Sequence, residues 1–101
     1  MSSFDEHVRR ALDTLPPELA AKLENVAVVV EDENAEDPDL LGLFQEEPYL
    51  PAKISIYRLP LEEEFGHDPV LLEREIRITV LHELAHYFGF DEERLGELGY
   101  D

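Results

Sequence analysis

One stretch of the sequence decides the fold: residues 68–89, DPVLLEREIRITVLHELAHYFG. Asp68 can accept hydrogen bonds at a helix N-terminus, and Pro69 suits the first helical position because its missing N–H is not needed there. Gly89 is a natural helix stop. The stretch therefore predicts a helix of about 20 residues, or roughly 30 Å. Its apolar side chains recur at helical spacing: Val70, Leu71, Ile76, Val80, Leu84 and Phe88.

The end of this predicted helix carries two histidines four residues apart, His82 and His86. Residues at this spacing lie one above the other on one helix face, so both imidazoles can reach a single metal ion. Glu83 projects beside them, suitably placed for a metal-bound water rather than for the metal. An H-E-x-x-H pattern is typical of zinc peptidases, in which the glutamate is the general base. The alternative is a helix with two surface histidines and no metal.

A catalytic zinc site uses three protein ligands and leaves one position open. Only 15 residues follow His86, so a downstream third ligand must come from a few acidic residues. Gly89 lets the chain leave the helix in a left-handed conformation and turn back under the metal. Glu92 follows three residues later and is the predicted third ligand, with Asp91 as the less favoured alternative. The complete set of candidates is Asp91, Glu92, Glu93, Glu97 and Asp101.

The composition restricts both the ligand types and the partners. The chain has 101 residues and no cysteine, so a bound metal must use His, Asp or Glu. Eight basic against 25 acidic residues give a net charge of -17, which would repel a phosphate backbone. No apolar run is long enough to span a membrane, and residues 1–6 do not resemble a signal peptide. We expect one cytoplasmic domain over residues 1–101, with no nucleic-acid or membrane partner and an oligomeric state that the sequence does not give.

The remaining sequence predicts an α+β fold with a small sheet. Ser3 and Glu6 form a capping box for a first helix that ends before Pro16, and a second, short helix begins at Pro17. The other expected segments are a buried strand (26–30), an exposed loop (31–39), a docking segment (40–45), a strand with one solvated face (53–59), a polar link (60–68) and a last helix (92–98). Of the other histidines, His7 is expected to be solvated, and His67 is too far from His82 along the helix to share its metal.

The run from His82 to Glu92, H-E-x-x-H-x-x-G-x-x-E, resembles the metzincin pattern, whose last ligand is usually His and is Asp in snapalysin-like enzymes. Residues 82–89 (HELAHYFG) and 92–95 (EERL) are similar to the small bacterial zincin-like metallopeptidases, also called minimal metalloproteases. Residues 40–45 (LLGLFQ) and 54–58 (ISIYR) resemble upstream segments of that family, so the resemblance covers about residues 25–101.

This resemblance implies a compact, zincin-like α+β domain, in which a small β-sheet packs against the helix with the H-E-x-x-H motif, and a zinc peptidase whose natural substrate is unclear. The sequence departs from the pattern in two places. Glu92 stands where the family has Asp, and its longer side chain shifts the geometry. The only methionine is Met1, so the methionine turn that lies beneath a metzincin metal is absent.

The hypothesis is therefore a peptidase with one Zn²⁺ bound by His82, His86 and Glu92, and with Glu83 as general base. Its substrate is a peptide or protein, and strand 53–59 is the expected sheet edge for pairing with an extended peptide. The two alternatives are a metal-binding domain that acts as an interaction module without hydrolysis, and a purely structural acidic domain. Candidate oxyanion donors, each of which also suits packing or surface roles, are Tyr57, Arg58, Tyr87 and Tyr100.

Overall fold

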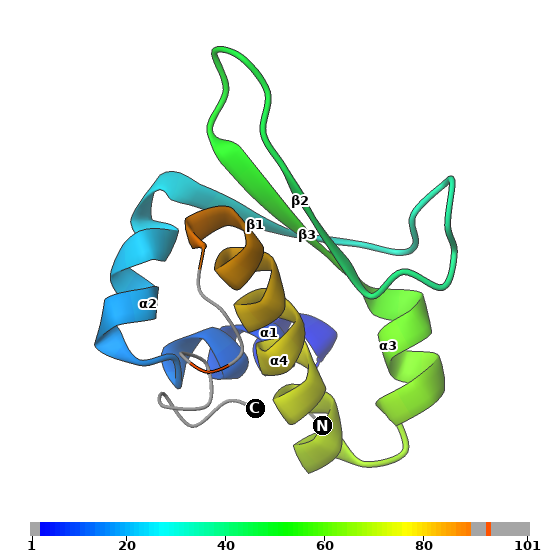
Figure 1. Ribbon diagram of the computed structural model, residues 1–101. Helices are drawn as coiled ribbons and strands as arrows, with labels where there is room; N and C mark the ends of the chain where they lie inside the picture. The colour runs from blue at the N-terminus through cyan, green and yellow to red at the C-terminus, as the bar shows by residue number, and fades with distance from the viewer. Residues whose placement is uncertain (1–2, 90–92, 94–101) are drawn as a thin grey trace.

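The computed structural model describes residues 3–89 and 93 of the chain. Within these residues, three strands and four α-helices form an α+β arrangement, as the sequence predicts (Figure 1). In chain order the elements are α1 (Phe4–Asp13), α2 (Pro17–Lys22), the 3-10 helix η1 (Leu23–Asn25), β1 (Val26–Glu31), β2 (Gly42–Gln45), β3 (Ala52–Tyr57), α3 (Arg58–Phe65) and α4 (Pro69–Phe88).

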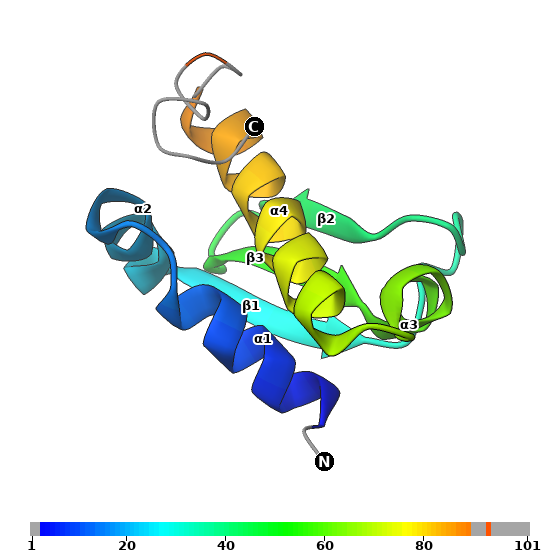
Figure 2. The ribbon, with the colours of Figure 1, turned by 90° about the horizontal axis from the view of Figure 1, so that it is seen from below.

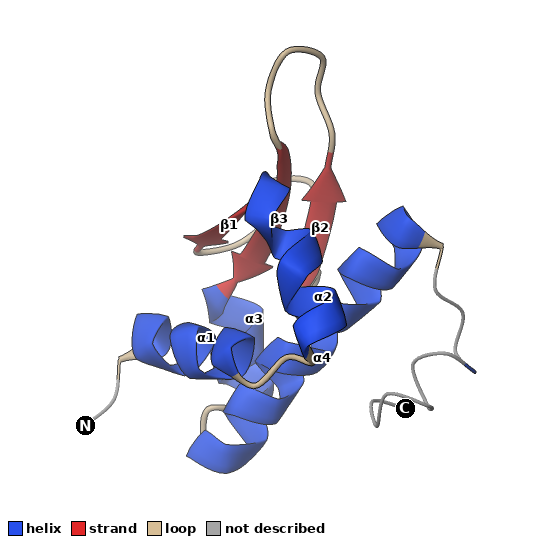
Figure 3. Cartoon of the chain, turned by 90° about the vertical axis from the view of Figure 1, so that its left-hand side faces the viewer, coloured by secondary structure: helices blue, strands red, loops and turns tan. Residues whose placement is uncertain are grey.

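The sheet has the strand order β1-β3-β2, so β3 lies in the centre. β1 runs parallel to β3, and β2 runs antiparallel to it, with Leu43 opposite Ser55 and Phe44 opposite Ile54. The connection between β2 and β3 extends away from the helices (Figure 3). Strand 53–59 was the predicted sheet edge, and this prediction is wrong because both sides of β3 are already paired. β2 and β1 are the edges.

The helices pack on one face of this sheet, with α4 crossing β3 and β2 and with α1 and α3 beside α4 (Figure 2). Ile54 and Ile56 of β3 are fully buried against this layer. Their helical partners are apolar residues of α4 in the same core: Leu72, Ile76, Val80, Leu81 and Leu84. Of the predicted apolar positions, Val70 is instead exposed. Burial of this face stabilises the helix, because aliphatic side chains contribute about 1.5–3 kcal/mol each when removed from water.

The predicted helix ends are confirmed. The Ser3 hydroxyl accepts a hydrogen bond from the Glu6 N–H, at 3.2 Å. The Asp68 carboxylate accepts from the N–H groups of the two residues that follow Pro69, as expected for an N-cap. Gly89 ends α4 with a φ of 74°, a left-handed conformation that glycine adopts without strain. The motif helix therefore spans the predicted 20 residues.

Several local predictions are wrong. The expected polar link at 60–68 contains α3, in which Pro60 lies in the first turn, Leu61 is buried and Arg58 pairs with Glu62 at 2.6 Å. Strand β3 has no solvated face over its last four residues, because Ser55 and Tyr57 are buried as well as the isoleucines. Strand β1 is a half-buried edge rather than a buried strand. The predicted docking of segment 40–45 onto the body is confirmed, and its residues Gly42–Gln45 form β2. The expected last helix, 92–98, lies outside the described residues except for Glu93.

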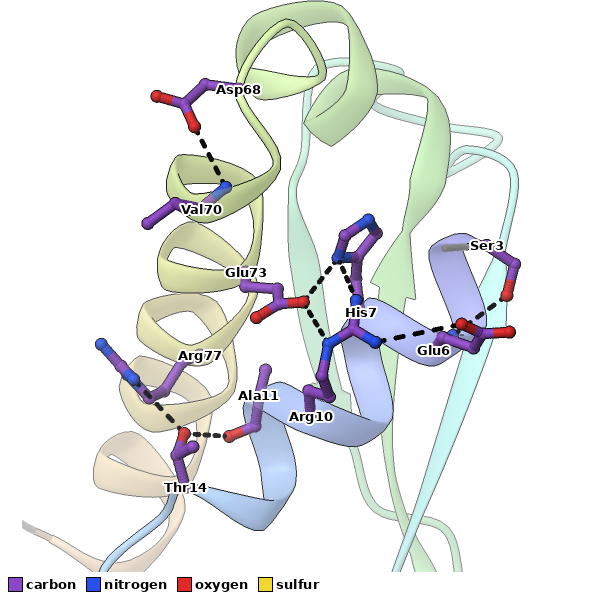
Figure 4. A network of polar contacts seen from close by, with 10 residues as sticks. All are labelled: Ser3, Glu6, His7, Arg10, Ala11, Thr14, Asp68, Val70, Glu73 and Arg77. Atoms are coloured by element: carbon purple, nitrogen blue, oxygen red, sulfur yellow. Dashed lines mark hydrogen bonds and ion pairs between the residues drawn. The ribbon is translucent and has the colours of Figure 1, made fainter. Parts of the chain in front are cut away.

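His7 is also placed differently from the expectation, because it is buried between α1 and α4 instead of solvated. Its Nδ1 lies 2.7 Å from Oε1 of Glu73, and Arg10 forms a salt bridge with the same carboxylate (Figure 4). The hydrogen bond with His7, followed by the contact with Arg10, lowers the pKa of Glu73. None of the described helices is long and apolar enough to cross a membrane.

Candidate metal and catalytic site

The last two turns of α4 carry the motif side chains. His82 and His86 are both exposed, and their spacing of four residues places them on one face of the helix. Neither imidazole has a hydrogen-bond or ion-pair partner within residues 3–89 and 93. Their ring nitrogens are therefore available to a metal ion, and imidazole is a preferred zinc ligand.

Glu83 lies beside the two histidines but in a different environment. Its side chain is half-buried between α4 and β2. The Oε2 atom accepts a hydrogen bond from the main-chain N–H of Phe44, with an N···O distance of 3.0 Å. This contact orients the carboxylate, and it engages only one of the two oxygens. The sequence contained no signal for it, because the donor is a main-chain group of a strand that the sequence did not resolve from a loop.

Gly42 allows β2 to approach α4 closely at this point. A Cβ atom at position 42 would lie 2.5 Å from Cγ2 of Thr79 and 3.2 Å from the carbonyl oxygen of Ser55. No side chain fits in that space. Farther along the strand, the Phe44 ring stacks on Tyr87 with a centroid distance of 4.3 Å. The close approach at Gly42 and the ring stacking at Phe44 together fix the position of β2 along the motif helix.

A groove runs beside these residues, with a volume of about 350 Å³. Its walls come from the loop before β2, from the start of β2 and from α4: Asp37, Asp39, Leu40, Leu41, Gly42, Thr79, His82 and Glu83. Asp32, in the same loop, pairs with Arg58 at 2.9 Å. By contrast, the described residues provide no cationic partner for Asp37 or Asp39. The groove next to the motif is therefore open and negatively charged.

The predicted third ligand, Glu92, and its alternative, Asp91, lie outside the described residues. Within the described part of the chain, no three His, Asp or Glu side chains come together as a metal-binding group. The site as described thus consists of two imidazoles and the Glu83 carboxylate. The donor types fit zinc, since two histidines and one further carboxylate make a common catalytic set.

The other candidates from the sequence separate into two groups. His67 is exposed in the turn before α4 and is not part of the groove. Tyr57 is buried and its hydroxyl receives a hydrogen bond from Asn34, while Arg58 is held by two carboxylates. Neither is therefore a suitable oxyanion donor. Tyr87, in the last turn of α4, is partly exposed beside Phe44, and Tyr100 lies outside the described residues.

The sequence profile of the zincin-like metallopeptidases matches residues 23–100, which is most of the chain. The chain belongs to this family. Comparison with curated protein sequences gives no match. Membership confirms the resemblance noted in residues 82–89 and agrees with the zincin-like α+β fold. It identifies the chain as a member of a metallopeptidase family and implies zinc binding in general.

Proposed function

We propose that the chain is a zinc-dependent peptidase in which Glu83 is the general base. One observation carries this proposal: a carboxylate oriented by a main-chain N–H lies one residue from an imidazole that has no partner among the described residues, in an open groove. A helix with merely solvated side chains has no need of such an oriented acid. Family membership supports the same function.

The residues have distinct roles in this proposal. His82 and His86 bind zinc through neutral imidazoles, and Glu92 is the third ligand, with Asp91 as the alternative. Zinc, when bound, supplies Lewis-acid chemistry that polarises a peptide carbonyl and acidifies water. Glu83 accepts the proton from the attacking water and delivers it to the leaving amine.

An extended peptide is the substrate that the sheet favours. In an antiparallel pair, successive residues alternate between facing the partner strand and facing away from it. The carbonyl of Leu41 faces β3, since it accepts from the N–H of Tyr57 at 3.0 Å. Leu43 and Gln45 therefore also face β3, and the main-chain groups of Gly42 and Phe44 face outward. A peptide can add to this edge as a further strand, next to the motif helix.

The charge of the groove favours peptides with basic side chains. Asp37 and Asp39 line it beside His82 without cationic partners among the described residues. A lysine or arginine of a bound peptide would offset these charges, whereas an acidic side chain would be repelled. We therefore infer a preference for cleavage sites that have a basic residue near the scissile bond.

A digest of a peptide library by the zinc-supplied protein tests the proposal, with Glu83→Gln as the comparison. The amide has nearly the shape of the acid but cannot accept the proton, so we expect kcat to fall at least about 100-fold. Zinc content should stay near one equivalent in both proteins. Equal cleavage by the variant and the wild type would remove Glu83 from its assigned role.

The second candidate is a metal-binding interaction module that does not hydrolyse peptides. The open groove of about 350 Å³ favours it, because such a groove encloses little of a substrate. The same digest separates the two functions. Zinc binding without any cleavage by the wild type supports the module, and cleavage that depends on Glu83 supports the peptidase.

A further inference from the structure

We propose that Phe44 and Tyr87 are positioning residues for Glu83. The main-chain N–H of Phe44 holds one oxygen of the carboxylate, and the Tyr87 ring holds Phe44 in place. This inference rests on the proposed role of Glu83 as general base. It gives segment 40–45 a function in the site, which the H-E-x-x-H motif alone does not explain.

The geometry that supports the proposal is a row of three contacts along α4. Thr79, Glu83 and Tyr87 follow at intervals of four residues, so they form one ridge of the helix. The ridge meets β2 at Gly42, at the N–H of Phe44 and at the Phe44 ring, respectively. The strand is therefore held on both sides of the hydrogen bond to Glu83.

The Phe44 N–H is free to serve Glu83 because it points away from β3. Its hydrogen bond with Glu83 removes no hydrogen bond from the sheet. A donor at Leu43 would do so, because the main chain of Leu43 pairs with Ser55. The contact engages Oε2 and leaves Oε1 available for a proton. Without it, the half-buried side chain would sample several rotamers, and a smaller share of molecules would present the base in its working position.

The contact also limits how a peptide can pair with β2. Three outward groups remain for a substrate strand: the N–H and C=O of Gly42 and the C=O of Phe44. These groups place the substrate main chain beside the base, while the base itself takes the fourth group. Substrate pairing and base orientation are therefore compatible on one edge.

Two variants of Phe44 separate the N–H from the ring. Phe44→Ala removes the ring and keeps the N–H, whereas Phe44→Pro removes both. Proline is acceptable at an edge-strand position whose N–H faces outward. We expect the kcat of Phe44→Pro to be at least about 10-fold below that of Phe44→Ala, with similar KM values. Equal kcat values in two folded variants would overturn the role of the N–H.

Two variants of Tyr87 test the ring. Tyr87→Phe keeps the stacking on Phe44 and removes the hydroxyl, so its kcat should stay within about twofold of the wild type. Tyr87→Ala removes the stacking, and its kcat should fall several-fold without a matching change in KM. A large loss in Tyr87→Phe would show that the hydroxyl acts in the reaction, and this would overturn the positioning role.

Amide hydrogen exchange provides a measurement that needs neither zinc nor activity. In Glu83→Ala, the Phe44 amide should exchange at least about 10-fold faster than in the wild type, because it has lost its acceptor. The amides of Leu43 and Gln45, which face β3, are internal controls and should not change. An unchanged Phe44 amide would overturn the inference. Absence of cleavage by the wild type would instead refute the peptidase function. The exchange result would still show whether the Phe44 amide is bound to Glu83.

Discussion

His7, His82 and His86 are the same residue type in two different environments. His7 is buried, and its ring nitrogen lies 2.7 Å from a carboxylate of another helix. Such a histidine contributes to packing and cannot turn to a metal without losing its partner. His82 and His86 are exposed and lack a partner in the described part of the chain. Exposure and the lack of a partner therefore distinguish the candidate ligands.

Removal of one ligand should weaken zinc binding strongly. We expect His82→Ala and His86→Ala each to lower the zinc affinity at least about 100-fold, since even indirect changes at zinc sites cost 10–100-fold. His67→Ala is the matched control, because His67 is exposed and lies outside the groove. Competition with a chromophoric chelator measures the affinities. A similar loss in all three variants would contradict the assigned ligand pair.

The third ligand is accessible to the same measurement. Glu92→Ala should lower the zinc affinity far more than Asp91→Ala, because Glu92 follows Gly89 at the spacing of the last ligand in the metzincin pattern that residues 82–92 resemble. We expect a difference of at least about 10-fold between the two variants. A larger loss of zinc affinity in Asp91→Ala than in Glu92→Ala would identify Asp91 as the ligand.

At the scale of elements, the motif helix was predictable and the sheet order was not. Helix α4 has a cap, an apolar period and a glycine stop within its own sequence, so local chemistry determines its limits. The central position of β3 depends on contacts between segments far apart in the chain. Its Ser55 and Tyr57 look like residues of a solvated face, but both are buried, and Asn34 of the loop before β2 donates a hydrogen bond to the Tyr57 hydroxyl. The contact between Phe44 and Glu83 depends on this order as well.

The contact between β2 and α4 should be sensitive to one methyl group. Gly42→Ala would place a Cβ atom 2.5 Å from Cγ2 of Thr79, which cannot rotate away because its hydroxyl bonds to the carbonyl of Glu75. We expect a loss of about 1–3 kcal/mol in the free energy of unfolding. Urea unfolding measures it.

Thr79→Ser supplies the control for Gly42→Ala, because serine keeps the hydroxyl and removes Cγ2. The double variant should recover most of the lost stability, with a coupling energy of about 1 kcal/mol. Strict additivity of the two changes would show that the clash does not limit the approach of β2.

The contact between α1 and α4 should make stability depend on pH (Figure 4). The hydrogen bond with His7 and the contact with Arg10 lower the pKa of Glu73 below its ordinary 4.5. This stabilisation is therefore present above pH 4.5 and is lost as the pH falls through the lower value in the folded state. Glu73→Gln should cost about 1 kcal/mol at pH 7 and progressively less toward pH 3.

Urea unfolding of Glu73→Gln at pH 7, 5 and 3 tests this dependence. Glu63→Gln is the matched control, since Glu63 is exposed on α3 and makes the same change in charge. A constant difference between Glu73→Gln and the wild type at all three pH values would contradict the ionic contribution.

At the scale of the whole molecule, the charge of -17 has two consequences. Like charges on two copies of the chain repel each other, which favours solubility and is sufficient to account for a highly acidic composition. In the proposed function it would also attract cations and basic peptides toward the groove, where Asp37 and Asp39 have no cationic partner among the described residues. Salt separates the charge attraction from strand pairing, because screening weakens the attraction between exposed charges but leaves hydrogen bonds at the strand edge almost unchanged.

For a peptide with lysine or arginine near the scissile bond, KM should therefore rise several-fold between about 0.05 and 0.5 M NaCl, with kcat nearly constant. A neutral peptide of the same length should show little change. The double variant Asp37→Asn/Asp39→Asn should lose most of the preference for the basic peptide. Glu33→Gln/Glu36→Gln changes the net charge equally in the same loop at residues that do not line the groove, so it should keep that preference. Equal losses in the two double variants would mean that the overall charge attracts the substrate and the groove does not select it.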